Sequence, residues 1–259
     1  MTPTPYPDVN DVIEQLASAM RRALGNRLSG LYLYGSLVTG DFDHVSSDID
    51  LVAVLPSDLT EAGFERLHGM HDDFARAHPR WDDRIEVAYI TASALRTFRV
   101  QPSIIAVISP GEPFHWKEAG RDWLMNWYVV REYGKTLTGP PPQTFIAPIS
   151  QEEYVSAVYQ HAMEWREWVA QTYLRKSQAY AILTMCRALY TLTTGAYCSK
   201  KQAAAWAERT WPEWSGVIEQ ALAWREAWQD ENVDHAATIP QTRRFVHFAA
   251  AECERIAGL

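Results

Sequence analysis

The chain has 259 residues, a length that is generous for one small domain and suits two. Hydrophobic residues make up 47% of the sequence, which is enough for an ordinary globular core. The formal net charge of -8 argues against a protein that grips nucleic-acid backbones broadly.

Cysteine usage and hydropathy favour a cytoplasmic protein. The sequence has three cysteines, Cys186, Cys198 and Cys253, and their spacing is not that of a metal site. Any disulfide would leave one cysteine unpaired, so we expect reduced thiols. The N-terminus lacks a basic region followed by an apolar run, and no stretch reaches about 18 apolar residues. We therefore expect neither a signal peptide nor a membrane-spanning helix.

The first part of the chain has the pattern of a helix followed by two strands. Asp8 or Asn10 is expected to cap a helix that runs to about Leu24, because apolar residues recur at four-residue spacing. Two short apolar runs follow, at 31–34 and 49–55, and each predicts a strand.

A second helix and a third strand are predicted next. Ser57 or Asp58 is expected to cap the helix, which ends before Pro79. Residues 84–90 alternate in hydropathy, so they predict a strand whose polar face carries Glu86. A carboxylate in the middle of a strand indicates either the exposed face of an edge strand or a position in an active site.

The following residues lead to a predicted domain boundary. The apolar run 104–108 predicts a strand or a buried segment, and a helical pattern begins at Arg121. A proline-rich stretch at 139–142 then interrupts the pattern. We place the boundary near Ser150, which gives domains of 1–149 and 150–259.

The second domain is predicted to be helical almost throughout. Ser150, with Glu153 three residues later, forms a capping box, and Ser199 is expected to cap another helix. Further helices are predicted at about 178–192, 213–229 and 241–256. The predicted fold class is an α+β N-terminal domain, a mixed sheet with helices, followed by an all-α helical bundle.

Two carboxylates open the predicted strand at 49–55. Asp48 and Asp50 lie two positions apart, so in a strand their side chains point to the same face. Two like charges at that distance are unfavourable unless a cation or a proton neutralises one of them. Oxygen ligands with open positions suit Mg²⁺. Without further signals, however, two such carboxylates at the edge of a strand are more often a solvated strand end.

The loop before these carboxylates has the composition of a phosphate site. Gly35 lets the backbone turn directly after a strand and brings Ser36 close to a ligand. The Ser36 hydroxyl and the amides of a helix that starts there can hold phosphate oxygens.

Together these features resemble a known superfamily. The segment 35–51, GSLVTGDFDHVSSDIDL, resembles the signature of the nucleotidyltransferases related to DNA polymerase β. The segment 187–206 and the stretch FVHF at 245–248 are similar to the C-terminal helical domain of the streptomycin/spectinomycin adenylyltransferases. The similarity covers nearly the whole chain in order.

The resemblance implies a two-domain enzyme that moves AMP from ATP to a hydroxyl of an aminoglycoside or aminocyclitol. It implies that Asp48 and Asp50 hold two Mg²⁺ ions, and that Glu86 is both the third acid of the metal site and the general base. The remaining site residues that it implies are Gly35, Ser36, Ser47, Arg187 and Lys200 for the nucleotide, and Trp123 and Trp168 for the acceptor. For a single Lys, Arg or Trp, a solvated charge or core packing remains the alternative.

One departure from the resembled family concerns the acceptor. Its drug-modifying members have acidic residues in the loop before the helix that carries the matched Arg187, whereas 170–178 has none and offers Tyr173, Arg175 and Lys176 instead.

Two other functions stay open: AMP transfer to a protein side chain or a non-antibiotic small molecule, and a catalytically inactive nucleotide-binding module. The expected partners are ATP and a small cationic acceptor, with no nucleic acid and no membrane, and we expect a monomer.

Overall fold

The computed structural model describes residues 2–226 and 233–258. The chain divides into two compact units. Unit 1 comprises Met1–Phe42 and Ser47–Pro148, and unit 2 comprises Asp43–Ser46 and Ile149–Leu259. The predicted fold class, a mixed sheet with helices followed by a helical region, is confirmed.

Unit 1 is built on one six-stranded sheet with the strand order β5-β4-β3-β2-β1-β6. The strands β2 and β3 run parallel, and the other neighbouring pairs are antiparallel. The parallel pair requires a crossover, which helix α3 (Glu61–Ala77) supplies. The strands are β1 Gly30–Tyr34, β2 Ile49–Leu55, β3 Ile85–Thr91, β4 Ser103–Ser109, β5 Glu112–Ala119 and β6 Lys135–Thr138.

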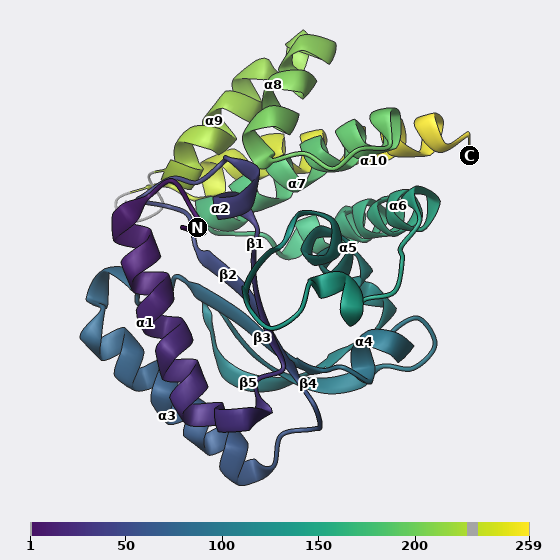
Figure 1. Ribbon diagram of the computed structural model, residues 1–259. Coiled ribbons are helices and arrows are strands. Elements are labelled where there is room, and N and C mark those ends of the chain that lie inside the picture. Colours follow the sequence, from purple (N-terminus) through teal and green to yellow (C-terminus); the bar gives the residue numbers. More distant parts are fainter. Residues whose placement is uncertain (1, 227–232, 259) are drawn as a thin grey trace. The chain divides into compact units, whose positions relative to one another are not determined.

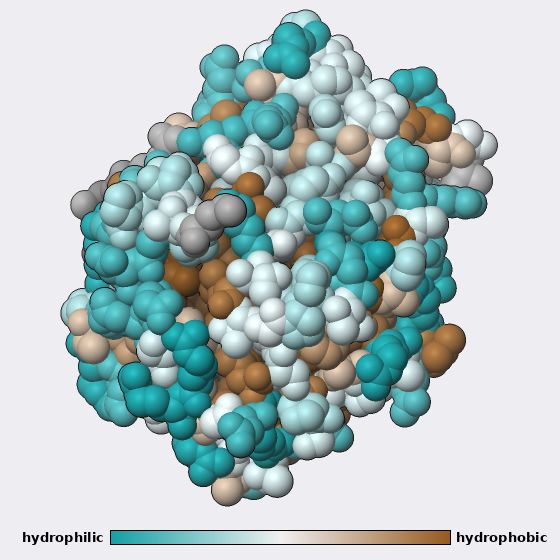
Figure 2. Space-filling model, in the orientation of Figure 1, coloured by the Kyte–Doolittle hydropathy of each residue, from teal (hydrophilic) through white to brown (hydrophobic). Residues whose placement is uncertain are grey.

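Helices α1 and α3 cover one face of this sheet (Figure 1). Their inward positions are apolar and pack on the alternate strand residues Leu31, Leu33, Leu51, Val87 and Tyr89, which form the core of the unit. Their outward faces are mainly hydrophilic (Figure 2). The helices of unit 1 are α1 Pro7–Leu24, α2 Ser36–Thr39, α3 Glu61–Ala77, α4 Ala94–Thr97 and α5 Leu124–Tyr133.

The helix starts in unit 1 differ from the prediction. Helix α1 begins at Pro7 after Tyr6, and the side chain of Asn10 instead accepts hydrogen bonds from the amide and hydroxyl of Thr4. Helix α3 is capped by Thr60, whose side chain accepts from the Gly63 amide, and not by Ser57 or Asp58. Several polar residues precede each helix, and only tertiary packing selects the one that caps it.

Two strands, β5 and β6, were not predicted from the sequence pattern. The edge strand β5 contains Pro113 and several charged residues, because one side of it needs no ladder partner. The strand β6 is four residues long at the opposite edge, too short to show an alternation.

Unit 2 is helical, as predicted. Helix α7 is its centre and contacts α6, α8, α9 and α10. Both expected caps are confirmed, since Ser150 with Glu153 and Ser199 with Gln202 form capping boxes. The helix predicted to reach about residue 229 is described up to Glu226, and its expected end lies outside the described residues. The helices are α6 Gln151–Trp168, α7 Arg175–Thr194, α8 Lys200–Thr210, α9 Ser215–Glu226 and α10 Ile239–Ala257.

Two further expectations can be compared with the structure. Cys186, Cys198 and Cys253 are buried thiols. In the part of the chain that the structure describes, no helix combines the length and apolar character that crossing a membrane would require.

Candidate active site

One row of side chains crosses three adjacent strands of unit 1. Tyr34 on β1 lies opposite Asp50 on β2, and Asp50 lies opposite Glu86 on β3. Residues directly opposite each other point to the same face of a sheet. The three side chains therefore lie side by side, on the face opposite to the apolar core formed with α1 and α3.

Tyr34 is the residue in this row that the sequence analysis missed. Its hydroxyl donates a hydrogen bond of 2.8 Å to Oε1 of Glu86. Burial, and then the charges of Glu86 and Asp50, hold the pKa of Tyr34 well above its ordinary value. The hydroxyl therefore keeps its proton at neutral pH and acts as a donor. Its position directly before the Gly-Ser turn was the available signal.

Gly35 lies against the carboxylate of Asp50. Its φ of +69° is in the region that favours glycine, and a Cβ at this position would collide with the side chain of Asp50. Ser36 follows as the first residue of the short helix α2 and is half-buried. The Asp50 carboxylate can therefore keep its position only because the residue in the tight turn has no side chain.

A buried cation holds the turn that carries Asp48. Arg84 is 6% exposed, and its Nε donates a hydrogen bond of 3.1 Å to the carbonyl of Ser47. A terminal nitrogen of the same guanidinium donates to that carbonyl as well, and the guanidinium lies 4.7 Å from the centre of the Trp81 ring. Ser47 is buried and Asp48 half-buried at the entrance of β2. Arg84 is the first residue of the strand expected at 84–90, on the face of Glu86; in the structure it directly precedes β3 and is buried.

The donor set for a metal ion consists of carboxylates. Asp50 and Glu86 are neighbours in register, and Asp48 directly precedes β2. Oxygen donors of this type fit Mg²⁺. Among the residues that the structure describes, however, no three His, Cys, Asp or Glu side chains are gathered closely enough to hold a metal ion. The residue types fit the ion, and the assignment of the three residues as ligands stays a prediction.

Trp123, predicted near the acceptor, is half-buried at the end of a 3-10 turn before α5. Its ring stacks on that of Trp127, with centroids 5.3 Å apart and an interplanar angle of 25°. Trp127 is fully buried, so it provides a fixed support for the Trp123 ring.

Unit 2 brings the two predicted phosphate-binding cations close to one tyrosine. The Nζ of Lys200, the first residue of α8, lies 4.8 Å from the centre of the Tyr180 ring. Arg187 on α7 is half-buried. Burial lowers its pKa, but the interaction with Tyr197, Tyr180 and Tyr154 outweighs it and raises the pKa, so Arg187 is a permanent cation.

Trp168 belongs to an aromatic cluster of unit 2, formed by His161, Trp165, Trp168 and Tyr180. Trp168 is 42% exposed, and its ring makes edge contacts at 5.6 Å with both His161 and Trp165. Burial, and then the charge of Arg187, lower the pKa of His161 to about 4. The neutral ring can therefore accept the hydrogen bond that Trp165 donates at 3.2 Å.

The stretch 170–178 corrects two expectations. It is not a loop throughout, because α7 already begins at Arg175. Arg175 is not a cation offered to an acceptor: its guanidinium lies 5.5 Å from the Trp224 ring centre and donates to the carbonyl of Asp234. Buried Gln178, in the first turn of α7, donates to the carbonyls of Tyr173 and His235, which ties the start of α7 to the segment before α10. Tyr173 itself is 56% exposed.

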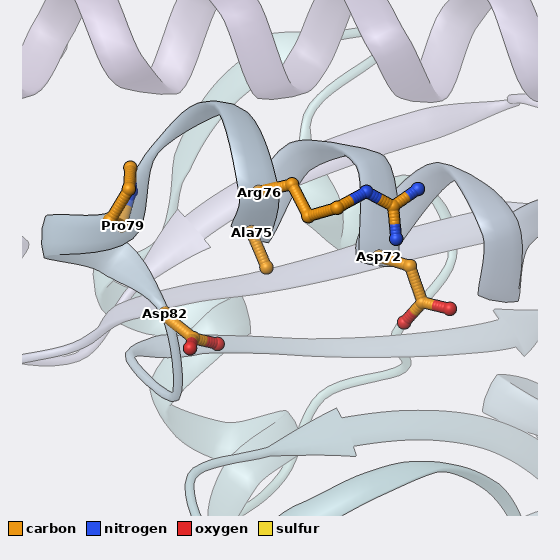
Figure 3. Close-up of a pocket in the computed structure, with 5 residues that line it drawn as sticks. All are labelled: Asp72, Ala75, Arg76, Pro79 and Asp82. Carbon is orange, nitrogen blue, oxygen red and sulfur yellow. The ribbon is translucent and has the colours of Figure 1, made fainter.

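Two open hollows on unit 1 contain none of the predicted site residues. One, of about 370 Å³, lies at the end of α3 and is lined by residues of both charges (Figure 3). The other, of about 760 Å³, lies between α1 and α3. Tyr34, Asp50 and Glu86 line neither of them.

Two family models match the chain in succession. The nucleotidyltransferase domain matches residues 13–106, and the model described as aminoglycoside adenylyltransferase, C-terminal domain, matches residues 144–252.

The curated relatives agree with the family models. Proteins named aminoglycoside (3'') (9) adenylyltransferase from Shigella flexneri and Escherichia coli are each 23% identical to the chain, over 97% of this chain and 97% of each relative. A protein of the same name from Klebsiella pneumoniae is 26% identical over 50% of this chain and 47% of its own length.

A solved structure shares the fold. It is a spectinomycin adenyltransferase AAD(9) from Enterococcus faecialis with ATP and spectinomycin, with a TM-score of 0.74 and 19% identity, covering 94% of this chain and 98% of that one. The two family models, matched in order along one chain, and relatives matched over nearly their full length all give the same answer: this chain belongs to the aminoglycoside adenylyltransferase family and is a nucleotidyltransferase.

Proposed function

We propose that the protein transfers AMP from ATP to a hydroxyl of an aminoglycoside or aminocyclitol and releases pyrophosphate. The observation that carries this proposal is the juxtaposition of Asp50 and Glu86 on parallel strands, beside the turn that begins at Gly35. The names of the relatives and the ATP and spectinomycin bound to the AAD(9) protein support it.

The proposed mechanism gives each residue one task. Glu86 takes the proton of the acceptor hydroxyl, whose oxygen attacks the α-phosphorus of ATP while the bond to pyrophosphate breaks. Ser36 and Ser47, with the turn at Gly35, hydrogen-bond phosphate oxygens. Asp48, Asp50 and Glu86 would hold Mg²⁺, which neutralises phosphate charge when it is bound.

The cations and tryptophans complete the assignment. Arg187 and Lys200 are proposed to neutralise the phosphates of ATP and the departing pyrophosphate. Trp123 and Trp168 are proposed to stack on the acceptor, since each has a neighbouring aromatic ring that holds it in place.

The test is a transfer assay with α-labelled ATP, Mg²⁺ and a panel that includes streptomycin and spectinomycin. We expect label on the antibiotic, a stoichiometric amount of pyrophosphate, and the loss of both in Asp50→Asn. Label on a protein instead of a small molecule would favour AMP transfer to a side chain. Binding of ATP without transfer to any acceptor would favour a nucleotide-binding module.

A further inference from the structure

The hydroxyl of Tyr34 connects helix α5 to the carboxylate of Glu86. Tyr34 is 6% exposed and donates to Oε1 of Glu86 at 2.8 Å. The side chain of Asn126, on α5, also interacts with Tyr34 and offsets part of the rise in its pKa. A chain of polar side chains thus leads from a helix to the residue that we propose as the general base.

A second tyrosine on the same strand shows that a buried tyrosine of β1 does not need a carboxylate as its hydrogen-bond partner. Tyr32 lies two residues earlier, points to the same face and is fully buried. Its hydroxyl donates to the backbone carbonyl of Pro140 at 2.7 Å. One tyrosine of β1 therefore anchors the chain, while the other is committed to a carboxylate.

The carboxylate of Glu86 needs such an anchor for two physical reasons. The terminal torsion of a glutamate is broad, so the carboxylate can rotate unless a partner holds it. Asp50 is its direct neighbour in register, and two like charges at that spacing push each other away. A donor placed in the same row opposes both effects.

We propose that Tyr34 is a positioning residue for the transfer reaction, whose hydroxyl holds the Glu86 carboxylate in the orientation that receives the proton of the acceptor. This inference rests on the proposed role of Glu86. The Tyr34 hydroxyl is the donor in this hydrogen bond, because a carboxylate oxygen can only accept. Tyr34 affects turnover through Glu86. The proposal does not require any contact between Tyr34 and the nucleotide.

The test compares Tyr34→Phe with Tyr32→Phe, which removes the hydroxyl of another buried tyrosine from the same strand and face. We expect Tyr34→Phe to lower kcat by about tenfold to a hundredfold, the range for a hydrogen bond to a charged group, and to leave the KM for ATP and the affinity for ATP unchanged. Tyr32→Phe should keep the wild-type kcat, and its melting temperature shows how much the loss of a buried tyrosine hydroxyl costs the fold. Equal losses of kcat in both variants would overturn the proposal.

A double-mutant cycle separates positioning from a general structural effect. In the Glu86→Gln background, measured in single turnover with labelled ATP, Tyr34→Phe should have no further effect on the rate. A full additional loss in that background would show that Tyr34 acts independently of Glu86.

Two further results keep the inference distinct from the function on which it rests. If Tyr34→Phe does not fold, Asn126→Ala removes the support of the Tyr34 hydroxyl and should lower kcat by a smaller factor, and a wild-type kcat there would contradict the proposal. A wild-type protein that labels no acceptor would refute the proposed function. An active wild type with an inactive Glu86→Gln and a fully active Tyr34→Phe would refute only the role of Tyr34.

Discussion

At the scale of single residues, the site depends on a glycine that fits against a carboxylate. Gly35 has φ +69° and ψ -147°, a combination that is essentially reserved for glycine, and it has no room for a Cβ beside Asp50. The chain also offers a control, because Gly40 has φ +78° and nothing within 4 Å of a Cβ built there. Substitutions at the two glycines therefore distinguish the effect of backbone strain from the effect of a collision with the Asp50 carboxylate.

We predict that Gly35→Ala loses both stability and transfer, whereas Gly40→Ala loses only stability. Backbone strain alone should cost each variant roughly 1–3 kcal/mol of unfolding free energy. Only Gly35→Ala also displaces the Asp50 carboxylate. Melting temperatures and kcat of both variants provide the comparison, and a Gly35→Ala enzyme with wild-type kcat would show that Asp50 tolerates displacement.

We predict that Asp50→Asn abolishes transfer and stays folded. The substitution keeps the shape of the side chain and removes the charge that a divalent cation would need. Circular dichroism should be unchanged while the labelled product disappears. Activity within about tenfold of the wild type would contradict the assignment, because a lost metal ligand costs much more.

At the scale of elements, α3 is joined to β3 by a buried histidine. His71 is 4% exposed, and its Nε2 lies 2.8 Å from the hydroxyl of Tyr89. Burial, and then the neighbouring His68, lower its pKa from 6.5 to about 3. The folded protein thus binds this proton more weakly than the unfolded chain, so stability falls as the pH drops below about 6.5.

We predict that His71→Gln reduces the loss of stability between pH 7 and pH 5. One proton with this pKa difference accounts for roughly 1–2 kcal/mol of unfolding free energy over that interval. Urea unfolding at the two pH values measures it, and the exposed His247→Gln should behave as the wild type does. An unchanged pH dependence in His71→Gln would mean that His71 binds its proton as strongly in the folded protein as in the unfolded chain.

The pairing of α7 and α8 leads to a second prediction at this scale. Lys200 begins α8, where the helix dipole disfavours a cation, and the Tyr180 ring offsets this. Lys200→Ala should weaken ATP binding by about tenfold to a hundredfold, and Tyr180→Leu by less, while Tyr180→Phe keeps the ring and the affinity. Lys201→Ala removes the same charge from the next residue and should bind ATP normally. Calorimetry that shows equal losses at Lys200 and Lys201 would indicate a general charge effect.

At the scale of the whole molecule, the prediction concerns the acceptor range. The stretch 170–178 has no acidic residue, and each missing charge-assisted hydrogen bond should cost about one to two decades in affinity. Streptomycin, with two guanidinium groups, should lose more than the smaller spectinomycin. The expected effect is the missing attraction. Arg175 packs on Trp224, and this contact holds its side chain in place without removing its charge.

Resistance of a susceptible host measures this preference. We expect protection against spectinomycin that exceeds protection against streptomycin. Strong streptomycin resistance that vanishes with Asp50→Asn would show that other acids, such as Glu164 or Glu167, take over the role of the stretch 170–178.

The sequence by itself determined the features that depend on near neighbours along the chain. The strands beside the Gly-Ser turn, the faces of β3 and both capping boxes of unit 2 follow from spacings of two to four residues. These features sufficed to predict the fold class, and the motifs at 35–51 and 187–206 pointed to the family.

The tertiary structure decided what depends on partners far apart in the chain. Strand order and register place Tyr34, Asp50 and Glu86 in one row, and no local pattern encodes which residues of separate strands become opposite each other. Likewise, Arg84 and Arg175 look like surface cations in the sequence, but Trp81 and Trp224 provide packing partners for them. A side chain's surroundings are set by packing between elements, and local propensity does not contain that information.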